Sequence, residues 1–184
     1  MGKSEYQKIA DMKKKAKYEL ATKSWSKESK DKPLLMIFAP AKDRELLFQI
    51  LEGSFVLPCH VIVVTDAASE TFAKHPSGKI TWVSEKESSN KPLISEYLWA
   101  ADMALVFEEH KKDLQEIMKH GVIVIGHAKS PFLQDYHPNE ETGNSFTFSS
   151  KSPWDMFMAL VRAHETYRFP YDWGNVVRGI LKAM

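Results

Sequence analysis

The sequence predicts an α/β protein with a doubly wound, Rossmann-like fold: a parallel six-stranded sheet with helices on both faces. Short apolar runs alternate with helical patterns along the whole chain. Most of these runs are continuous rather than alternating, which is typical of strands buried on both faces. Residues 101–127 form one complete strand–helix–strand pattern, in which Gly121 follows the helix.

The expected strands are apolar runs bounded by turn residues. They cover residues 34–39, 59–65, 79–83, 103–107, 122–125 and 145–148. The expected helices carry apolar residues three and four positions apart, or open with a capping or helix-starting residue. They cover residues 4–21, 44–52, 67–75, 90–100, 109–120, 152–168 and 172–184.

Local signals mark several helix ends. Gly53 is expected to end the second helix, and Asp66 is expected to cap the third. Ser152-Pro153 predicts the start of a long helix, because serine caps a helix and proline fits its first turn. Pro170 is expected to break that helix. Six aromatic residues near its ends have the spacing of core anchors: Trp154, Phe157, Tyr167, Phe169, Tyr171 and Trp173.

Length and composition favour one ordinary globular domain. The 184 residues suit an N-terminal helix and linker over 1–32 and a single domain over 33–184. The formal net charge of +1 argues against nucleic acid or an anionic membrane as the main partner. A single cysteine, Cys59, excludes an internal disulfide and a cysteine metal cluster. No apolar run reaches membrane-spanning length and the N-terminus is charged, so we expect a cytoplasmic protein.

No self-sufficient catalytic motif is present in the sequence. It lacks GxGxxG, P-loop, HExxH and GxSxG patterns, and no two histidines stand four residues apart. We therefore assign no catalytic residue and expect no metal site. In open parallel sheets, ligands bind beyond the carboxyl ends of the strands. The residues expected there as a ligand site are Lys42, Glu108, His127 and Lys129.

Each of these residues also has a structural interpretation. Lys42 could bind a phosphate together with the N-terminus of the following helix, or it could be a solvated turn lysine. Glu108 could bind a sugar or ribose hydroxyl, or it could favour the start of the next helix. His127 is favoured as a surface or helix-end histidine over a catalytic one.

From residue 101 onward, short motifs follow one another in a distinctive order. They are Ala101-Asp102, Phe107-Glu108, Met118-Lys119-His120-Gly121, Val122 to Ile125, Asp135, Thr142-Gly143, Phe146, Phe148, Tyr167-Arg168-Phe169-Pro170, Trp173 and Ala183-Met184. The series resembles the C-terminal half of bacterial glycogen and starch synthases, which are retaining glycosyltransferases of the GT-B fold with two Rossmann-like domains. The resemblance implies half of a GT-B fold, and ADP-glucose or UDP-glucose as the ligand, without a further cofactor.

The chain departs from this family where the family holds the phosphates of the sugar donor. The family has an Arg and a Lys after the first strand, and only Lys42 matches them. Its Gly-Gly loop is replaced by Ser130-Pro131-Phe132, and proline offers no backbone N–H. Its Glu-Pro-x-Gly motif is replaced by Glu108-Glu109-His110-Lys111. The family's N-terminal acceptor domain has no counterpart in these residues.

Two functions from different classes remain open. The first is a degenerate nucleotide-sugar-binding domain that is not catalytic alone. The second is a glycosyltransferase that transfers glucose from ADP- or UDP-glucose to a glucan as a fragment or as one subunit of a split enzyme. For either function, a protein partner could supply the N-terminal glycosyltransferase domain. A binding module unrelated to sugar is a more remote alternative.

Overall fold

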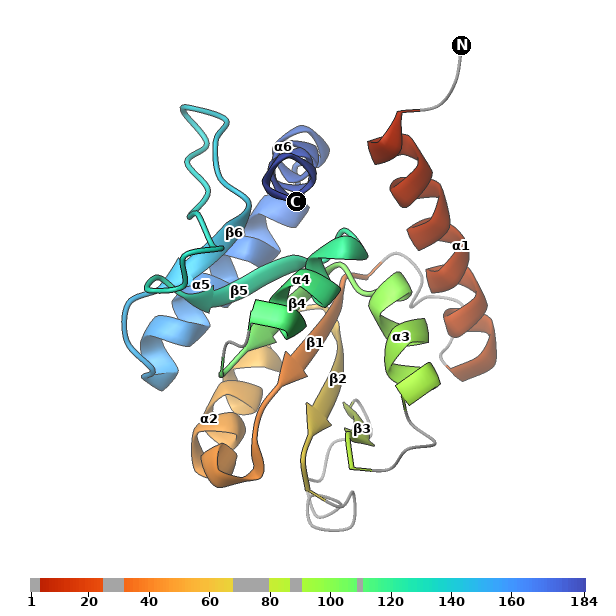
Figure 1. Cartoon of the computed structure of the whole chain (residues 1–184). Coiled ribbons are helices and arrows are strands. Elements are labelled where there is room, and N and C mark those ends of the chain that lie inside the picture. Colours follow the sequence, from red (N-terminus) through yellow and green to blue (C-terminus); the bar gives the residue numbers. More distant parts are fainter. Residues whose placement is uncertain (1–3, 25–31, 68–79, 87–90, 109–110) are drawn as a thin grey trace.

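The strands form one parallel sheet, as predicted. The computed structural model describes residues 4–24, 32–67, 80–86, 91–108 and 111–184 (Figure 1). Within them, six strands pair in the order β3-β2-β1-β4-β5-β6, and every neighbouring pair is parallel. The strands are β1 (Leu34–Phe38), β2 (His60–Thr65), β3 (Ile80–Ser84), β4 (Met103–Val106), β5 (Ile123–His127) and β6 (Ser145–Phe148).

Helices cover both faces of this sheet. They are α1 (Glu5–Ser24), α2 (Arg44–Ser54), α3 (Lys91–Ala100), α4 (Lys111–Lys119), α5 (Pro153–Tyr167) and α6 (Pro170–Ala183), and a short 3₁₀ turn, η2 (Ala41–Asp43), precedes α2. The chain runs from β1 through α2 to β2, and from β4 through α4 to β5. These two steps lead toward opposite sides of the sheet. Right-handed crossovers therefore place α2 and α4 on opposite faces. Helix α5 packs beside α2, whereas α3 lies with α4 and α1 (Figure 1).

The strand order reverses between β1 and β4, which makes this the topological switch point of the sheet. Both strands are buried, and all four residues of Leu34 to Ile37 are inaccessible to solvent. Phe38 of β1 pairs with Val106 of β4, so the two strands end level with each other. The segments that follow them therefore lie side by side at one edge, which we call the carboxyl edge.

Several helix ends differ from the prediction. Helix α1 continues to Ser24, three residues beyond its expected end. Gly53 lies inside the last turn of α2, where a Cβ atom would be 2.9 Å from the Phe157 ring, so it gives space for α5 rather than ending the helix. Pro170 not only separates two helices but is the first residue of α6. Proline is tolerated there because backbone N–H groups in the first turn of a helix have no partner within the helix. The expected helix over 67–75 falls almost entirely outside the described residues.

The expectation that all six C-terminal aromatic residues anchor the core is wrong for three of them. Phe157, Tyr167 and Trp173 do pack against the core. Trp154, Phe169 and Tyr171 are 69%, 59% and 64% exposed. The fully buried residues of α5 are instead Met156, Ala159, Leu160, Ala163 and His164. The Ser152–Pro153 start of this helix is confirmed, since the Ser152 hydroxyl accepts a hydrogen bond from the Asp155 N–H at 3.2 Å.

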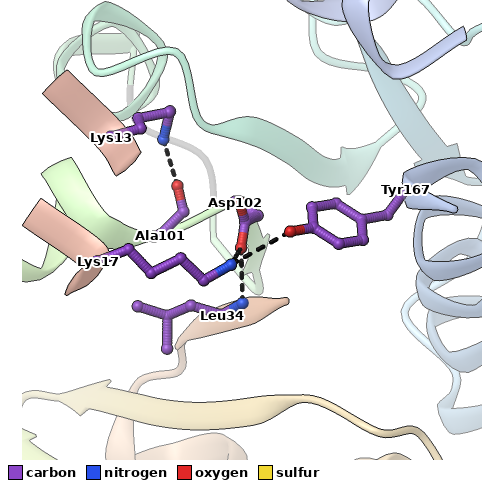
Figure 2. A network of polar contacts seen from close by, with 6 residues as sticks. All are labelled: Lys13, Lys17, Leu34, Ala101, Asp102 and Tyr167. Atoms are coloured by element: carbon purple, nitrogen blue, oxygen red, sulfur yellow. Dashed lines mark hydrogen bonds and ion pairs between the residues drawn. The ribbon is translucent and has the colours of Figure 1, made fainter. Parts of the chain in front are cut away.

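A buried polar network fastens α1 to the opposite, amino edge of the sheet. Asp102, immediately before β4, accepts hydrogen bonds from the Lys17 ammonium at 2.6 Å and from the Leu34 N–H at 2.8 Å (Figure 2). Lys17 also donates to the Tyr167 hydroxyl at 3.2 Å. Burial opposes the charge on Lys17, but Asp102 and Tyr167 more than offset it, so the pKa of Lys17 is raised. One carboxylate thus joins α1, β1 and β4.

Lys13 lies one turn earlier on α1 and donates to the Ala101 carbonyl (Figure 2). Burial lowers the pKa of its ammonium to about 8, the charge of Lys17 acts in the same direction, and the charge of Asp102 opposes both. Folding therefore favours the neutral amine.

The division of the chain into 1–32 and 33–184 stays a prediction, although α1 itself contacts α3 and α6.

We expect the stability of the protein to rise with pH between 7.5 and 9. In this range the unfolded chain keeps the Lys13 proton and the folded chain loses it, so the free energy of unfolding increases by about 1 kcal/mol. Lys17 does not oppose this, because its contribution is lost only above the ordinary lysine pKa. Burial raises the pKa of the Cys59 thiol from 9.0 to about 11, so the unfolded chain releases this proton first and offsets part of the rise from about pH 8 upward. Urea unfolding at several pH values should show the rise, and Lys13→Met should abolish it; an equal rise in Lys13→Met would contradict this assignment.

Candidate functional site

Two of the four predicted site residues meet at the switch point. Lys42 lies in η2 after β1, and Glu108 follows β4. Their side chains form an ion pair, in which the hydrogen bond to Glu108 and its charge raise the pKa of Lys42. Both side chains remain partly accessible, Lys42 by 66% and Glu108 by 37%. Solvent-exposed ion pairs stabilise a fold little, so this pair contributes little to the stability of the sheet edge.

The other two predicted residues lie together at the end of β5. The Lys129 N–H donates to Nδ1 of His127 at 3.1 Å. The imidazole packs edge-on against Phe148, with ring centroids 5.6 Å apart. Neither residue lines the cavity described below. The structure therefore brings the four residues to one edge of the sheet but gathers them as two separate pairs.

The turn after β5 keeps its backbone donors for itself. The Ser130 N–H bonds to the His127 carbonyl at 3.0 Å, and the Leu133 N–H bonds to the Ser130 carbonyl at 3.3 Å. Pro131, between them, has no N–H to offer. The segment that replaces the expected Gly-Gly loop is thus a closed turn, in which these two N–H groups are already used.

Sequence reasoning missed Lys151, which follows β6 at the same edge. Its ammonium forms an ion pair with Asp43 of η2 at 2.5 Å and lies 5.9 Å from the centroid of the Phe107 ring. Lys151 thus links β6 to the segments after β1 and β4. The rule that predicted the other residues could have found it, because Lys151 also follows the carboxyl end of a strand.

Asp66, which was expected to cap a helix, instead joins the ends of two strands. It follows β2, and its Oδ1 accepts a hydrogen bond from the Ala41 N–H at 2.6 Å. The helix that Asp66 was expected to cap lies almost entirely beyond the described residues. The observed bond joins the ends of β1 and β2 and places a carboxylate at the first turn after β1.

A cavity of about 360 Å³ opens at this edge, between α3 and α4. Apolar side chains from the strands and both helices form its floor, among them Phe38, Val64, Leu98, Val106 and Ile117. Of the described residues that line it, five are acidic and none is basic: Asp66, Glu85, Glu108, Asp113 and Glu116. Partial burial, followed by the charges of Asp113 and Asp66, raises the pKa of Glu85. We call this the switch-point cavity.

A second cavity, of about 630 Å³, lies at the amino edge between residues 134–144 and α6. It includes Arg178 and Lys182 and is remote from the carboxyl ends of the strands.

No three histidine, cysteine, aspartate or glutamate side chains gather as a metal site in the described parts of the chain. Among the helices in those parts, none is long and apolar enough to cross a membrane.

Comparisons with known proteins identify the fold. Neither models of known protein families nor curated protein sequences match the chain. Among solved structures, the catalytic domain of starch synthase IV from Arabidopsis thaliana, bound to ADP and acarbose, matches with a TM-score of 0.68 and 15% sequence identity. The match covers 96% of this chain but only 39% of that chain. The expectation of half a GT-B fold is thereby confirmed, and a likeness at this identity carries the fold alone.

Proposed function

We propose that this chain is a degenerate nucleotide-sugar-binding domain that does not transfer glucose alone. The observation that carries the proposal is the switch-point cavity, which lies where open α/β sheets bind their ligands. Glu108 lines it, and a carboxylate there is suited to accept hydrogen bonds from the hydroxyls of ribose or glucose. ADP-glucose and UDP-glucose are the ligands we propose, with Lys42, His127 and Lys129 beside the cavity at the same edge.

The lack of transfer follows from what this chain contributes to a catalytic cleft. In two-domain transferases the domains close over the reactants and exclude water. The described chain forms one sheet, and the match spans 39% of the similar synthase structure, so the facing side of the cleft has to come from another domain or a partner protein. The closed turn after β5 also lacks free backbone N–H groups at Ser130 and Leu133 that could approach the leaving phosphate and stabilise it. Losing one such electrostatic contact commonly costs about 10²–10³ in rate.

We expect purified protein to release no nucleotide from ADP-glucose or UDP-glucose in the presence of a glucan primer. Calorimetry with both sugar nucleotides should nevertheless detect weak binding. The control for the assay is the Lys42→Ala variant. Steady nucleotide release with chain elongation, lost in Lys42→Ala, would contradict the proposal and favour the alternative, a glucosyltransferase that acts as a fragment or as a split-enzyme subunit. That alternative rests on the retained Lys42–Glu108 pair.

A further inference from the structure

The carboxyl edge contains three groups of the kind that hold phosphates in proteins. The Ala41 N–H is a backbone hydrogen-bond donor in the first turn after β1. Lys42 and Lys151 are the lysines that follow β1 and β6. Charge-assisted hydrogen bonds from groups of this kind are the strong contacts in phosphate recognition.

Each of these three groups already has a carboxylate of the protein as its partner. Asp66 Oδ1 accepts the hydrogen bond of Ala41 N–H at 2.6 Å. Glu108 pairs with Lys42. Asp43 pairs with Lys151 at 2.5 Å. A phosphate arriving at this edge would have to displace a carboxylate from each donor and would leave that carboxylate without its partner.

The switch-point cavity beside these groups adds to the same effect. Its described lining carries five carboxylates and no basic side chain, so a diphosphate placed in it would meet like charges. The apolar floor and the carboxylate oxygens suit a different ligand, one that combines a flat apolar face with hydroxyl groups.

We propose that the switch-point cavity binds the uncharged, hydroxyl-bearing ring of its ligand, a nucleoside or a sugar, and that Asp66 and Glu108 keep any phosphate of that ligand away from the Ala41 N–H and Lys42. The location of the ligand rests on the proposed function given above. The carboxylates act as internal substitutes for phosphate: they occupy the donors that a sugar nucleotide would otherwise use. The ring of a ligand therefore carries the binding, and its diphosphate adds nothing or weakens it.

Removing the two carboxylate charges tests this directly. Asp66→Asn and Glu108→Gln each keep a side-chain oxygen as acceptor but no longer carry a negative charge. We expect the double variant to bind inorganic pyrophosphate at least about ten times more tightly than the unmodified protein does. The matched control is Glu165→Gln, which removes one carboxylate charge from an exposed ion pair with Arg168, outside the lining of the cavity. It should leave pyrophosphate binding within about twofold.

The second arm compares ligands on the unmodified protein by calorimetry. Adenosine and ADP differ in the diphosphate alone, and we expect adenosine to bind at least as tightly as ADP. Adenosine, uridine and glucose together show which ring the cavity accepts. Circular dichroism of each variant confirms that it is folded.

Two results would overturn the inference. One is ADP binding tenfold or more tightly than adenosine to the unmodified protein, which would leave the proposed function standing. The other is unchanged pyrophosphate affinity in the folded double variant. Absence of binding by every ring and sugar nucleotide would instead refute the proposed function, and a gain for pyrophosphate in the double variant would still support the exclusion of phosphate by Asp66 and Glu108.

Discussion

Replacing Asp102 by alanine should lower the free energy of unfolding by about 3–5 kcal/mol, because it leaves the buried Lys17 ammonium without its counter-charge. The Asp102 carboxylate also accepts the Leu34 N–H at 2.8 Å, so the change removes the acceptor of a backbone donor at the start of β1. The side chains of Asp102 and Lys17 are only 13% and 11% exposed, and water cannot fully replace the lost partners. Urea unfolding followed by circular dichroism measures the loss.

The matched control is an exposed pair on the same helix. Lys15 and Glu19 stand four residues apart with 4.0 Å between their charged atoms, and both are largely solvated. Lys15→Met should change the free energy of unfolding by less than about 0.5 kcal/mol. A cycle that combines Lys17→Met with Asp102→Ala should give less than the sum of the single losses. A loss below about 1 kcal/mol for Asp102→Ala would contradict the role of this network in fastening α1.

Gly143→Ala should also destabilise the protein, by about 2–4 kcal/mol, through backbone strain and overlap together. Gly143 has φ +112°, a region that only glycine adopts without strain. A Cβ atom there would lie 2.4 Å from the Asp135 carbonyl oxygen and 2.6 Å from the Tyr136 Cα. These neighbours are backbone atoms, so the segment before β6 would have to move. Thermal unfolding of the variant measures the effect.

Gly174→Ala in α6 provides the comparison. Its backbone is helical, and an added Cβ would meet the ends of the Tyr6 and Arg178 side chains at 3.1 and 3.3 Å. These flexible ends can shift, and alanine favours a helix over glycine by about 1 kcal/mol. We therefore expect a change within about 1 kcal/mol of zero. Equal losses in Gly143→Ala and Gly174→Ala would show that the conformation of Gly143 is not the cause.

The strands could be predicted because their signal is local. Runs such as Leu34 to Ile37 and Val122 to Ile125 are apolar throughout, and a strand buried on both faces requires this of its sequence. Parallel pairing then followed from the alternation with helices. Ligands of open parallel sheets bind beyond the carboxyl ends of the strands, so Lys42 and Glu108 could be placed at one edge before any contact was known.

The partners of these residues could not be predicted, because they come from distant parts of the chain. Asp66 looked like a helix cap from its neighbours, whereas its observed bond is to Ala41, 25 residues earlier. Lys151 pairs with Asp43 across 108 residues. Periodicity also could not show which face of α5 is buried and that Trp154 stays exposed, since both faces of that helix carry apolar side chains.

The central claim is that a sugar-nucleotide ligand binds between the carboxyl ends of β1 and β4. Titrating ¹⁵N-labelled protein with ADP-glucose and following the backbone amides by NMR tests it most directly, because this detects millimolar binding and locates it. We expect saturable shifts at Ala41, Asp66, Phe107 and Glu108, with little change at the amino edge around Gly143 and Arg178. No shift at millimolar ADP-glucose, or shifts confined to that amino edge, would contradict it.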